Sequence, residues 1–223
     1  MTCYVIISGV DGSGKTSIIN GVKAALEREG KSVSYIWMRY NNYLVTILHA
    51  VAKLIGLSKK EETPMGKMWV HYFYKNPFFC WAYIRCKYID AWVSKNKPLK
   101  FSTDYVICDR WVNDILIDIA SEIRQPGIIE GKWLHKFQTL LPDNNKQFVV
   151  IRSKKEVLDC RVENTFNPAF EKRYELYDLL SRKDNVIRIE NDGALNESIE
   201  NVLDIIRNKI YIYGRYYGNS PYL

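Results

Sequence analysis

The sequence has few cysteines, and their number and spacing disfavour two common uses of this residue. The five cysteines are odd in number, and no two of them form a C-x-x-C pair. A disulfide framework needs an even set, and zinc-binding motifs usually contain closely spaced cysteine pairs. We therefore expect reduced and mostly buried thiols at Cys3, Cys80, Cys86, Cys108 and Cys160.

A long hydrophobic run is also lacking. The longest apolar segment, residues 43–57, contains His49 and Lys53 and is too short to span a bilayer. The first β-prone run starts almost at the N-terminus, which leaves no room for a signal peptide. These features predict a cytoplasmic protein without stable membrane insertion.

Lysine and arginine never form a block, although basic residues are in excess. The net charge is +7, and the sequence pI is about 9.0. This moderate charge suits a protein that handles small phosphate compounds, but dispersed basic residues predict no nucleic-acid-binding stripe. Histidine is scarce as well, and we assign no catalysis to the isolated His49, His71 and His135.

What the sequence does contain is the pattern G-x-x-x-x-G-K-[ST] at residues 9–16. It lies between an apolar run at residues 4–8 and a helical pattern that begins near Lys15, which is the setting of a Walker A phosphate-binding loop, or P-loop. Glycines let backbone N–H groups surround an anion, Lys15 would reach the β- and γ-phosphates, and the Thr16 hydroxyl would bind Mg²⁺. The sequence therefore predicts an ATP site formed by Gly9, Val10, Asp11, Gly12, Ser13, Gly14, Lys15, Thr16 and Ser17.

Strand and helix patterns alternate along the rest of the chain. The β-prone runs lie at residues 4–8, 33–37, 105–108, 148–151 and 186–189. A strand–helix–strand order predicts a parallel sheet with right-handed connections. We expect a single α/β domain over residues 1–210 and a tyrosine-rich tail over 211–223. Between the second and third strands we expect a charged loop at 58–64 and a long aromatic helix at 66–95, interrupted at Asn76-Pro77.

Asp109-Arg110, at the end of the third apolar strand, helps to choose among P-loop proteins. Asp109 could hold Mg²⁺ or its water shell, and Arg110 could bind a second phosphate beside the transferred one, although a simple surface ion pair is the alternative. A GTPase would carry an N-K-x-D-like motif after a later strand, and a motor ATPase would have Asp-Glu at the end of an apolar run. Neither pattern is present, which favours a small-molecule kinase.

These motifs resemble, in order, those of the thymidylate kinase family of nucleoside-monophosphate kinases. The most specific are the loop at residues 9–16 and the Asp-Arg-aromatic triplet at 109–111. Weaker matches are Arg39 after the second strand, the Trp81–Arg85 pair on a helix, and Arg161 after the fourth strand. The resemblance implies a three-layer P-loop kinase fold, a five-stranded parallel sheet flanked by helices, a lid over about 152–170, and a homodimer.

The resemblance also implies roles for these residues. Lys15, Asp11, Arg110 and Arg161 would be catalytic, with Asp11 facing the acceptor phosphate or its Mg²⁺ shell and Arg161 closing over the transferred group. Arg39 and Arg110 would hold the acceptor phosphate, Trp81 would stack on the base, Arg85 would hydrogen-bond it, and Asp109 would join Thr16 at the metal. Each residue also has a plain structural interpretation, such as a core position for Trp81 or a pairing of Arg161 with a glutamate of its own helix.

The chain departs from the family pattern on the acceptor side. Ser8 stands where the family has an acid, residues 39–42 do not follow the family's Arg-Glu-Pro-Gly-Gly-Thr, and the positions after 109–111 carry Asn113, Asp114 and Asp118. We expect ATP-dependent phosphoryl transfer, with thymidylate as the best single acceptor (ATP + dTMP giving ADP + dTDP). The alternatives are a kinase for another small acceptor, a non-catalytic nucleotide-binding protein and, more weakly, a membrane-surface protein.

Overall fold

The computed structural model describes residues 2–38, 42–63, 66–141, 145–161 and 170–208. Five parallel strands form the central sheet, in the order β2-β5-β1-β6-β7. The strands are β1 (Cys3–Ser8), β2 (Val33–Trp37), β5 (Tyr105–Asp109), β6 (Lys146–Arg152) and β7 (Ile187–Glu190). This arrangement confirms the predicted α/β fold with a five-stranded parallel sheet flanked by helices.

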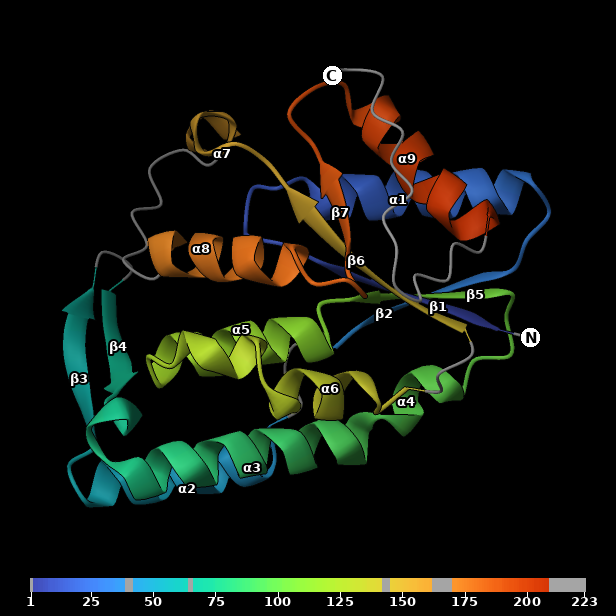
Figure 1. Ribbon diagram of the computed structural model, residues 1–223. Helices are drawn as coiled ribbons and strands as arrows, with labels where there is room; N and C mark the ends of the chain where they lie inside the picture. Colours follow the sequence, from blue (N-terminus) through green and yellow to red (C-terminus); the bar gives the residue numbers. More distant parts are fainter. Residues whose placement is uncertain (1, 39–41, 64–65, 142–144, 162–169, 209–223) are drawn as a thin grey trace.

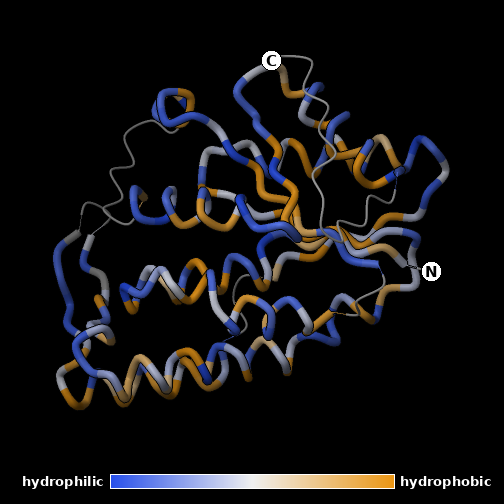
Figure 2. The backbone as a smooth tube through the Cα atoms, in the orientation of Figure 1, coloured by the Kyte–Doolittle hydropathy of each residue, from blue (hydrophilic) through white to orange (hydrophobic). Residues whose placement is uncertain are grey.

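The central strand β1 shows why the sheet is covered on both faces. Its side chains alternate between two cores, with Val5 and Ile7 in one and Tyr4 and Ile6 in the other. Successive side chains of a strand point to opposite faces, so a run of apolar residues needs helices on both sides. Figure 2 shows hydrophobic residues gathered in these strands.

Helices form the layers on either side of the sheet (Figure 1). On one face, α1 (Lys15–Arg28) packs beside α9 (Leu195–Arg207). On the other face, α5 (Val112–Glu122) contacts α6 (Lys132–Gln138) and α8 (Phe170–Ser181). Beyond α5 lies α3 (Pro77–Ser94), and α2 (Leu44–Leu54) packs against α3. This second face therefore carries an additional outer layer, which positions residues 44–94 away from the sheet.

The smaller elements are an antiparallel pair of strands, short helices and two turns of 3₁₀ helix. The strands are β3 (Ser58–Thr63) and β4 (Gly66–His71), and the short helices are α4 (Asn96–Leu99) and α7 (Lys155–Arg161). The 3₁₀ turns are Phe73–Lys75 and Pro126–Ile129.

The β3–β4 pair corrects two sequence predictions, the loop at 58–64 and the helix at 66–71. Lys60 and Trp69 are directly opposite in the ladder, and the Lys60 ammonium lies 5.6 Å from the Trp69 ring. At the open end, the Ser58 Oγ and His71 Nδ1 atoms are 2.6 Å apart. Cross-strand pairs of this kind stabilise a ladder that single-residue hydrophobicity does not reveal. The predicted interruption at Asn76-Pro77 is the start of α3, because the Asn76 side chain accepts from the Phe78 N–H (2.9 Å).

Two histidines that look isolated in the sequence are neighbours in the structure. The rings of His49, on α2, and His71, on β4, stack with their centroids 4.0 Å apart. Both lie near Phe73, which is fully buried. Burial lowers the pKa of His49 to about 4 and lowers the pKa of His71, because the charged ring is poorly solvated there.

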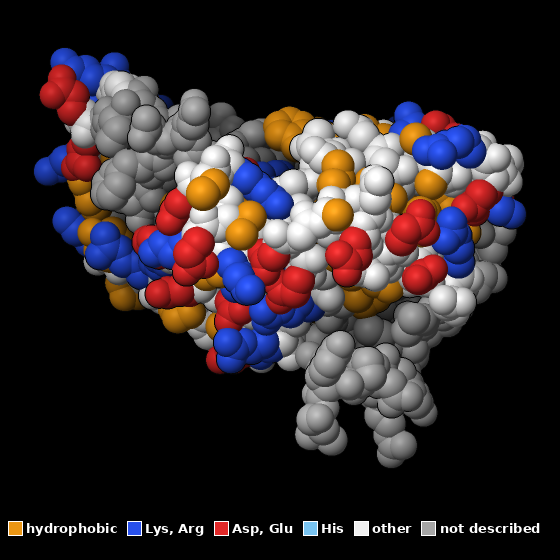
Figure 3. Space-filling view, turned by 90° about the horizontal axis from the view of Figure 1, so that it is seen from above, with side chains coloured by type: hydrophobic (Ala, Val, Ile, Leu, Met, Phe, Trp, Pro, Cys, Tyr) orange, Lys and Arg blue, Asp and Glu red, His pale blue; other side chains and the backbone are white. Residues whose placement is uncertain are grey.

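None of the helices in the described ranges is long and apolar enough to cross a membrane. The face seen from above in Figure 3 carries acidic and basic side chains close together. Charges of opposite sign that alternate over a surface cancel at distances beyond the Debye length.

Candidate active site

The candidate site lies where the central strands end at their carboxyl edge. The loop of residues 9–14 joins β1 to α1, Asp109 and Arg110 follow the apolar part of β5, and Asn191 directly follows β7. In open parallel sheets, ligands bind at this edge because the loops after neighbouring strands meet there. The topology therefore brings together residues that are about a hundred positions apart in the sequence, such as Asp11 and Arg110.

The loop after β1 has the backbone of an anion site. Gly14 caps α1 with φ +86°, and a Cβ there would lie 2.3 Å from the Asn191 Nδ2 atom. At Gly9, a Cβ would lie 2.5 Å from the Ile151 carbonyl oxygen. Both positions thus require glycine for space as well as for conformation. The N–H groups of the first helical turn have no partner within the helix, so the loop offers donors and a positive dipole to an anion.

Lys15 is the cation of this loop, and only 6% of the residue is exposed. Its ammonium group donates to the Val10 carbonyl oxygen at 2.7 Å. Burial, together with the nearby Arg110, lowers the pKa of Lys15 to about 8, although Asp114, Asp11 and Asp109 oppose the shift. A buried ammonium close to a second cation is stabilised by an added anion, which is the chemistry of phosphate binding.

Arg110 is the second cation, and it pairs with Asp11 of the loop. Its backbone has φ +56°, an uncommon conformation for a non-glycine residue, and its N–H donates to the Ile7 carbonyl at 3.2 Å. Burial lowers the pKa of Arg110, but Asp114, Tyr177 and Asp11 outweigh that effect and raise it. Strained backbone of this kind persists where the surroundings hold it, and it is frequent at functional sites.

Asp109 fits the predicted metal role. The Tyr35 hydroxyl donates to its Oδ2 atom at 3.0 Å, while its Oδ1 atom is buried and has no hydrogen-bond partner among the described residues. Burial and this hydrogen bond raise the pKa of Tyr35 to about 12. No cluster of three or more metal-ligating side chains occurs in the described ranges. Mg²⁺ at phosphate sites needs only one or two protein ligands besides water and phosphate, so Asp109 and the exposed Thr16 suffice.

A buried network behind the loop was not foreseen from the sequence. The Ser8 hydroxyl and the Tyr177 hydroxyl each donate to the carboxylate of Asp114, both at 2.5 Å. Ser8, Asp114 and Tyr177 are almost fully buried and come from β1, α5 and α8. The sequence signal was an acidic residue in the first turn of an apolar helix directly after Asp109-Arg110.

The residues after β6 and β7 support the loop from the other side. The Asn191 Nδ2 atom donates to the Ser13 carbonyl at 2.8 Å, and Ser153 donates to the Asn191 carbonyl at 2.9 Å. Arg161, on α7, donates to the Ser153 hydroxyl at 3.1 Å. A Cβ on Gly14 would lie 3.8 Å from the Arg161 Nη1 atom. The structure therefore brings Arg161 to the P-loop, as the predicted lid role requires.

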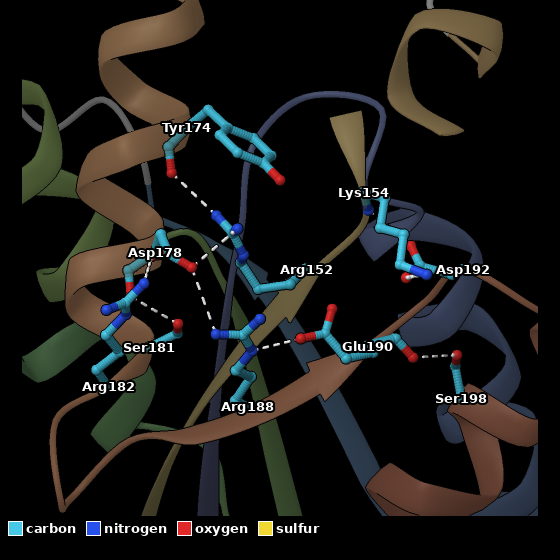
Figure 4. A network of polar contacts seen from close by, with 10 residues as sticks. All are labelled: Arg152, Lys154, Tyr174, Asp178, Ser181, Arg182, Arg188, Glu190, Asp192 and Ser198. Atoms are coloured by element: carbon cyan, nitrogen blue, oxygen red, sulfur yellow. Dashed lines mark hydrogen bonds and ion pairs between the residues drawn. The ribbon is translucent and has the colours of Figure 1, made fainter. Parts of the chain in front are cut away.

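The carboxyl ends of β6 and β7 are fixed by the charged network of Figure 4. Asp178 on α8 accepts from Arg152 at 2.9 Å, from Arg182 at 2.5 Å and from Arg188 at 3.3 Å. Arg152 is 5% exposed, and its guanidinium also lies 4.2 Å from the Tyr174 ring. A buried cation needs such partners. The network ties α8, which carries Tyr177, to the strands that end beside the loop.

Trp81 and Arg85 are not brought to this group of residues by any contact in the described ranges. The Arg85 guanidinium lies 3.9 Å above the Trp81 ring, and Phe78 stacks on the same ring. Trp81 is 51% exposed, and Arg85 also faces Trp133 on α6. The two residues form a surface cluster on α3, so their predicted contact with an acceptor base stays a prediction.

Three further predictions lie wholly or partly outside the described residues. These concern Arg39, the part of the lid at 162–169 and the tail at 211–223. The five cysteines are all described and none is in a disulfide, but only Cys80 and Cys108 are buried and Cys160 is exposed, so the prediction of mostly buried thiols is wrong.

No protein-family model matches this sequence, and no curated protein matches it. The chemistry of the site therefore has to be inferred from its own geometry.

Proposed function

We propose that this protein is an ATP-dependent nucleoside-monophosphate kinase of the thymidylate kinase type. The observation that carries the proposal is a pair of cations at one glycine-rich loop, the buried Lys15 from the start of α1 and the partly buried Arg110 from the end of β5. Phosphoryl transfer needs positioning and charge neutralisation more than covalent chemistry, and two cations at a glycine-rich loop supply both.

In this proposal the P-loop and Lys15 hold the β- and γ-phosphates of ATP. An oxygen of the acceptor phosphate attacks the γ-phosphorus, the bond to the β–γ bridging oxygen breaks, and ADP leaves with that electron pair. Arg110, held by Asp11, binds the acceptor phosphate, because a planar guanidinium can meet two phosphate oxygens at once. Mg²⁺ held by Thr16 and Asp109 would neutralise charge on the β- and γ-oxygens.

Arg161 is the third cation of the proposed mechanism. Its contact with Ser153 places it beside Gly14, at the mouth of the loop rather than inside it. A cation supplied from a lid stabilises the charge that builds up on the transferred group. In this proposal Arg161 therefore acts on the transfer of the phosphoryl group and not on the binding of ATP, whereas Lys15 serves both.

The placement of Trp81 and Arg85 favours a second candidate, a kinase for another small acceptor. Both side chains are engaged with each other on the outer surface of α3. The variant Arg85→Ala separates the candidates: a higher KM for thymidylate would show that the base reaches α3. Unchanged kinetics would show that the base binds at a surface away from Arg85. The cytoplasmic location and the homodimer stay predictions.

The proposal is tested with purified protein, Mg²⁺-ATP and a panel of nucleoside monophosphates, by measuring ADP and diphosphate formation. We expect turnover with at least one monophosphate, and selective turnover of thymidylate would identify the acceptor. Lys15→Met should remove turnover, whereas Lys23→Met, an exposed lysine of the same helix that pairs with Glu27 at 3.7 Å, should not. Triphosphate binding without transfer to any acceptor would instead support a non-catalytic nucleotide-binding protein.

A further inference from the structure

One stretch of the chain, residues 43–100, carries the whole excess of positive charge. It contains ten lysines and arginines and three acids, whereas the rest of the chain has 22 basic and 22 acidic residues. The stretch runs from the N-cap of α2 through the β3–β4 pair and α3 to the end of α4, and we call it the outer segment. Of its three acids, Asp90 is 2% exposed and accepts the N–H groups of Leu44 and Val45 at the start of α2. The positive charge of the protein is therefore concentrated in one part of the fold.

The outer segment also exposes most of the large hydrophobic side chains that reach solvent. Among the described residues, fifteen such side chains are exposed, and twelve of them belong to this segment. They are Tyr43, Ile47, Val51, Leu54, Ile55, Trp69, Phe78, Trp81, Ile89, Trp92, Val93 and Leu99. Single apolar residues scattered over a surface need no explanation, but a concentration of them indicates a surface that binds a partner.

Helix α2 has apolar side chains on its solvent-facing side as well as on its packed side. Val45 and Ala52 are fully buried, while Ile47 and Leu54 are 62% and 86% exposed. The polar residues of the helix are only three, namely Thr46, His49 and Lys53. A helix that is apolar on all sides is normally buried on all sides. The outer side of α2 therefore has no matching cover among the described residues.

The exposed tryptophans of the outer segment are each accompanied by a cation. The three rings are 42–51% exposed. The pairs are Arg85 with Trp81, Lys53 with Trp69 and Lys95 with Trp92, at 3.9 Å, 4.5 Å and 5.1 Å from the ring centroids. Tryptophan is enriched at the membrane–water interface, where its ring lies at the level of the lipid headgroups. Long basic side chains can bury their apolar stems beside such rings and keep the charge at the headgroups.

We propose that the outer segment is a docking surface for an anionic lipid bilayer, on which the protein lies without spanning the membrane. The apolar side chains enter the boundary between headgroups and acyl chains, and the basic residues are attracted by the negative headgroups. In Figure 1, α2 and α3 form the lower edge of the molecule, opposite α9, whereas the face seen from above in Figure 3 is mixed in charge. The protein therefore binds with the α2–α3 side toward the membrane. This inference goes beyond the proposed kinase function and does not depend on it.

A second copy of the chain fits this surface less well than a bilayer does. A two-fold symmetric contact brings the same patch of both copies together. The outer segment has a net charge of +7 in each copy, so such a contact would place like charges against each other, which disfavours association. A bilayer with anionic lipids presents the opposite charge across the whole surface.

The test measures binding to vesicles by co-sedimentation. The vesicles contain either phosphatidylcholine alone or phosphatidylcholine mixed with phosphatidylserine. The variants are I47Q/L54Q on α2, which keeps a good helix former at both exposed positions, and K59Q/K60Q on β3. The matched controls are Leu195→Gln, at a 40% exposed position on α9, and K23Q/K31Q, which removes two exposed lysines from α1 and the turn after it.

We expect the wild type to bind the mixed vesicles at least about 10-fold more tightly than the neutral ones, and added salt should weaken this binding. K59Q/K60Q should lower the affinity about 10- to 30-fold, because each basic residue near the surface contributes to the attraction. I47Q/L54Q should lower it about 10- to 100-fold, because two apolar side chains no longer enter the bilayer. Both controls should bind within about twofold of the wild type, since their positions lie on the other side of the sheet.

Three results would overturn the inference. The first is a wild type that binds mixed and neutral vesicles equally or binds neither. The second is I47Q/L54Q that binds vesicles like the wild type, and if it also changed a dimer into a monomer in analytical ultracentrifugation, the surface would belong to a second copy. The third is binding of an oligonucleotide that K59Q/K60Q weakens, without vesicle binding, which would assign the surface to nucleic acid.

Folding and catalysis are separated from lipid binding in the same experiment. The substituted side chains are exposed, so thermal melts followed by circular dichroism should match the wild type. If I47Q/L54Q fails to fold, Leu54→Gln alone, at the more exposed position, tests the same apolar contact. Vesicle binding needs no nucleotide, so a wild type that binds vesicles without transferring phosphate from ATP contradicts the kinase proposal alone.

Discussion

Cations have different surroundings in two regions of the molecule. One region is the P-loop edge, and the other is the outer layer formed by α2, α3 and the β3–β4 pair. At the P-loop edge, the buried Lys15 and the partly buried Arg110 lie near carboxylates, and neither makes a cation–π contact with a ring of the described residues. In the outer layer, Arg85 lies over Trp81 and Lys53 lies 4.5 Å from the Trp69 ring. Exposed cation–π pairs contribute only about 0.5–1 kcal/mol. Lys15 and Arg110 are held by oxygen atoms of Val10 and Asp11, whereas Arg85 and Lys53 lie over aromatic rings.

The largest expected effect is on the P-loop side. Arg161→Ala should lower the turnover number by about a thousandfold, because a lid arginine acts on the transition-state charge. It should leave the affinity for ATP within about threefold, since the residue binds Ser153 and not the loop. Steady-state kinetics and ATP calorimetry measure the two quantities. Lys53→Ala removes a stacked cation of the outer layer and should leave the turnover number and the ATP affinity unchanged. A loss of either in this variant would contradict the difference between the two regions.

A change in the core of the outer layer should affect stability and not binding. Phe73 is fully buried among His49, His71, Phe79 and Tyr83. Phe73→Ala should therefore lower the free energy of unfolding by about 3–5 kcal/mol in urea titrations.

The matched control is Phe78→Ala, because Phe78 is 64% exposed and its removal should cost less than about 0.5 kcal/mol. In both variants the affinity for tripolyphosphate should equal that of the wild type at temperatures where the protein is folded. A loss of affinity in Phe73→Ala would show that the outer layer and the P-loop edge are coupled.

The smallest expected effect is an acid sensitivity of the outer layer. The pKa of His49 is about 4 in the folded protein and about 6.5 when unfolded. Between these values the unfolded chain binds more protons, so stability should fall as the pH decreases from 6.5 toward 4. We expect His49 to contribute about 1 kcal/mol, since its ring is partly exposed. Urea titrations at pH 7 and pH 5 measure this contribution when wild type is compared with His49→Phe. An equal loss of unfolding free energy in the two proteins between pH 7 and pH 5 would contradict it.

The two regions also differ in how much of their structure the sequence could predict. The five strands were predicted because each is a local pattern of neighbouring residues, and the loop at residues 9–14 and Asp109-Arg110 lie at strand ends as expected. The β3–β4 pair was missed because its stability comes from cross-strand contacts such as Ser58 with His71. The sequence showed Asp114 but gave no sign of its partners, since Ser8 lies 106 positions before it and Tyr177 63 positions after it. The stacking of Arg85 and Phe78 on the Trp81 ring depends on side-chain directions that helical spacing alone does not indicate.

The hydrogen bond from Lys15 to the Val10 carbonyl has a consequence for how tightly a triphosphate is held. The side chain is already immobilised in its short contact of 2.7 Å, so an incoming phosphate oxygen meets a donor that has little rotamer freedom left to lose. An ammonium group has three donors and this bond uses one of them, so in the proposed site a phosphate oxygen can bind Lys15 without displacing the Val10 carbonyl. The same bond would then hold the ammonium in place before and after the ligand enters.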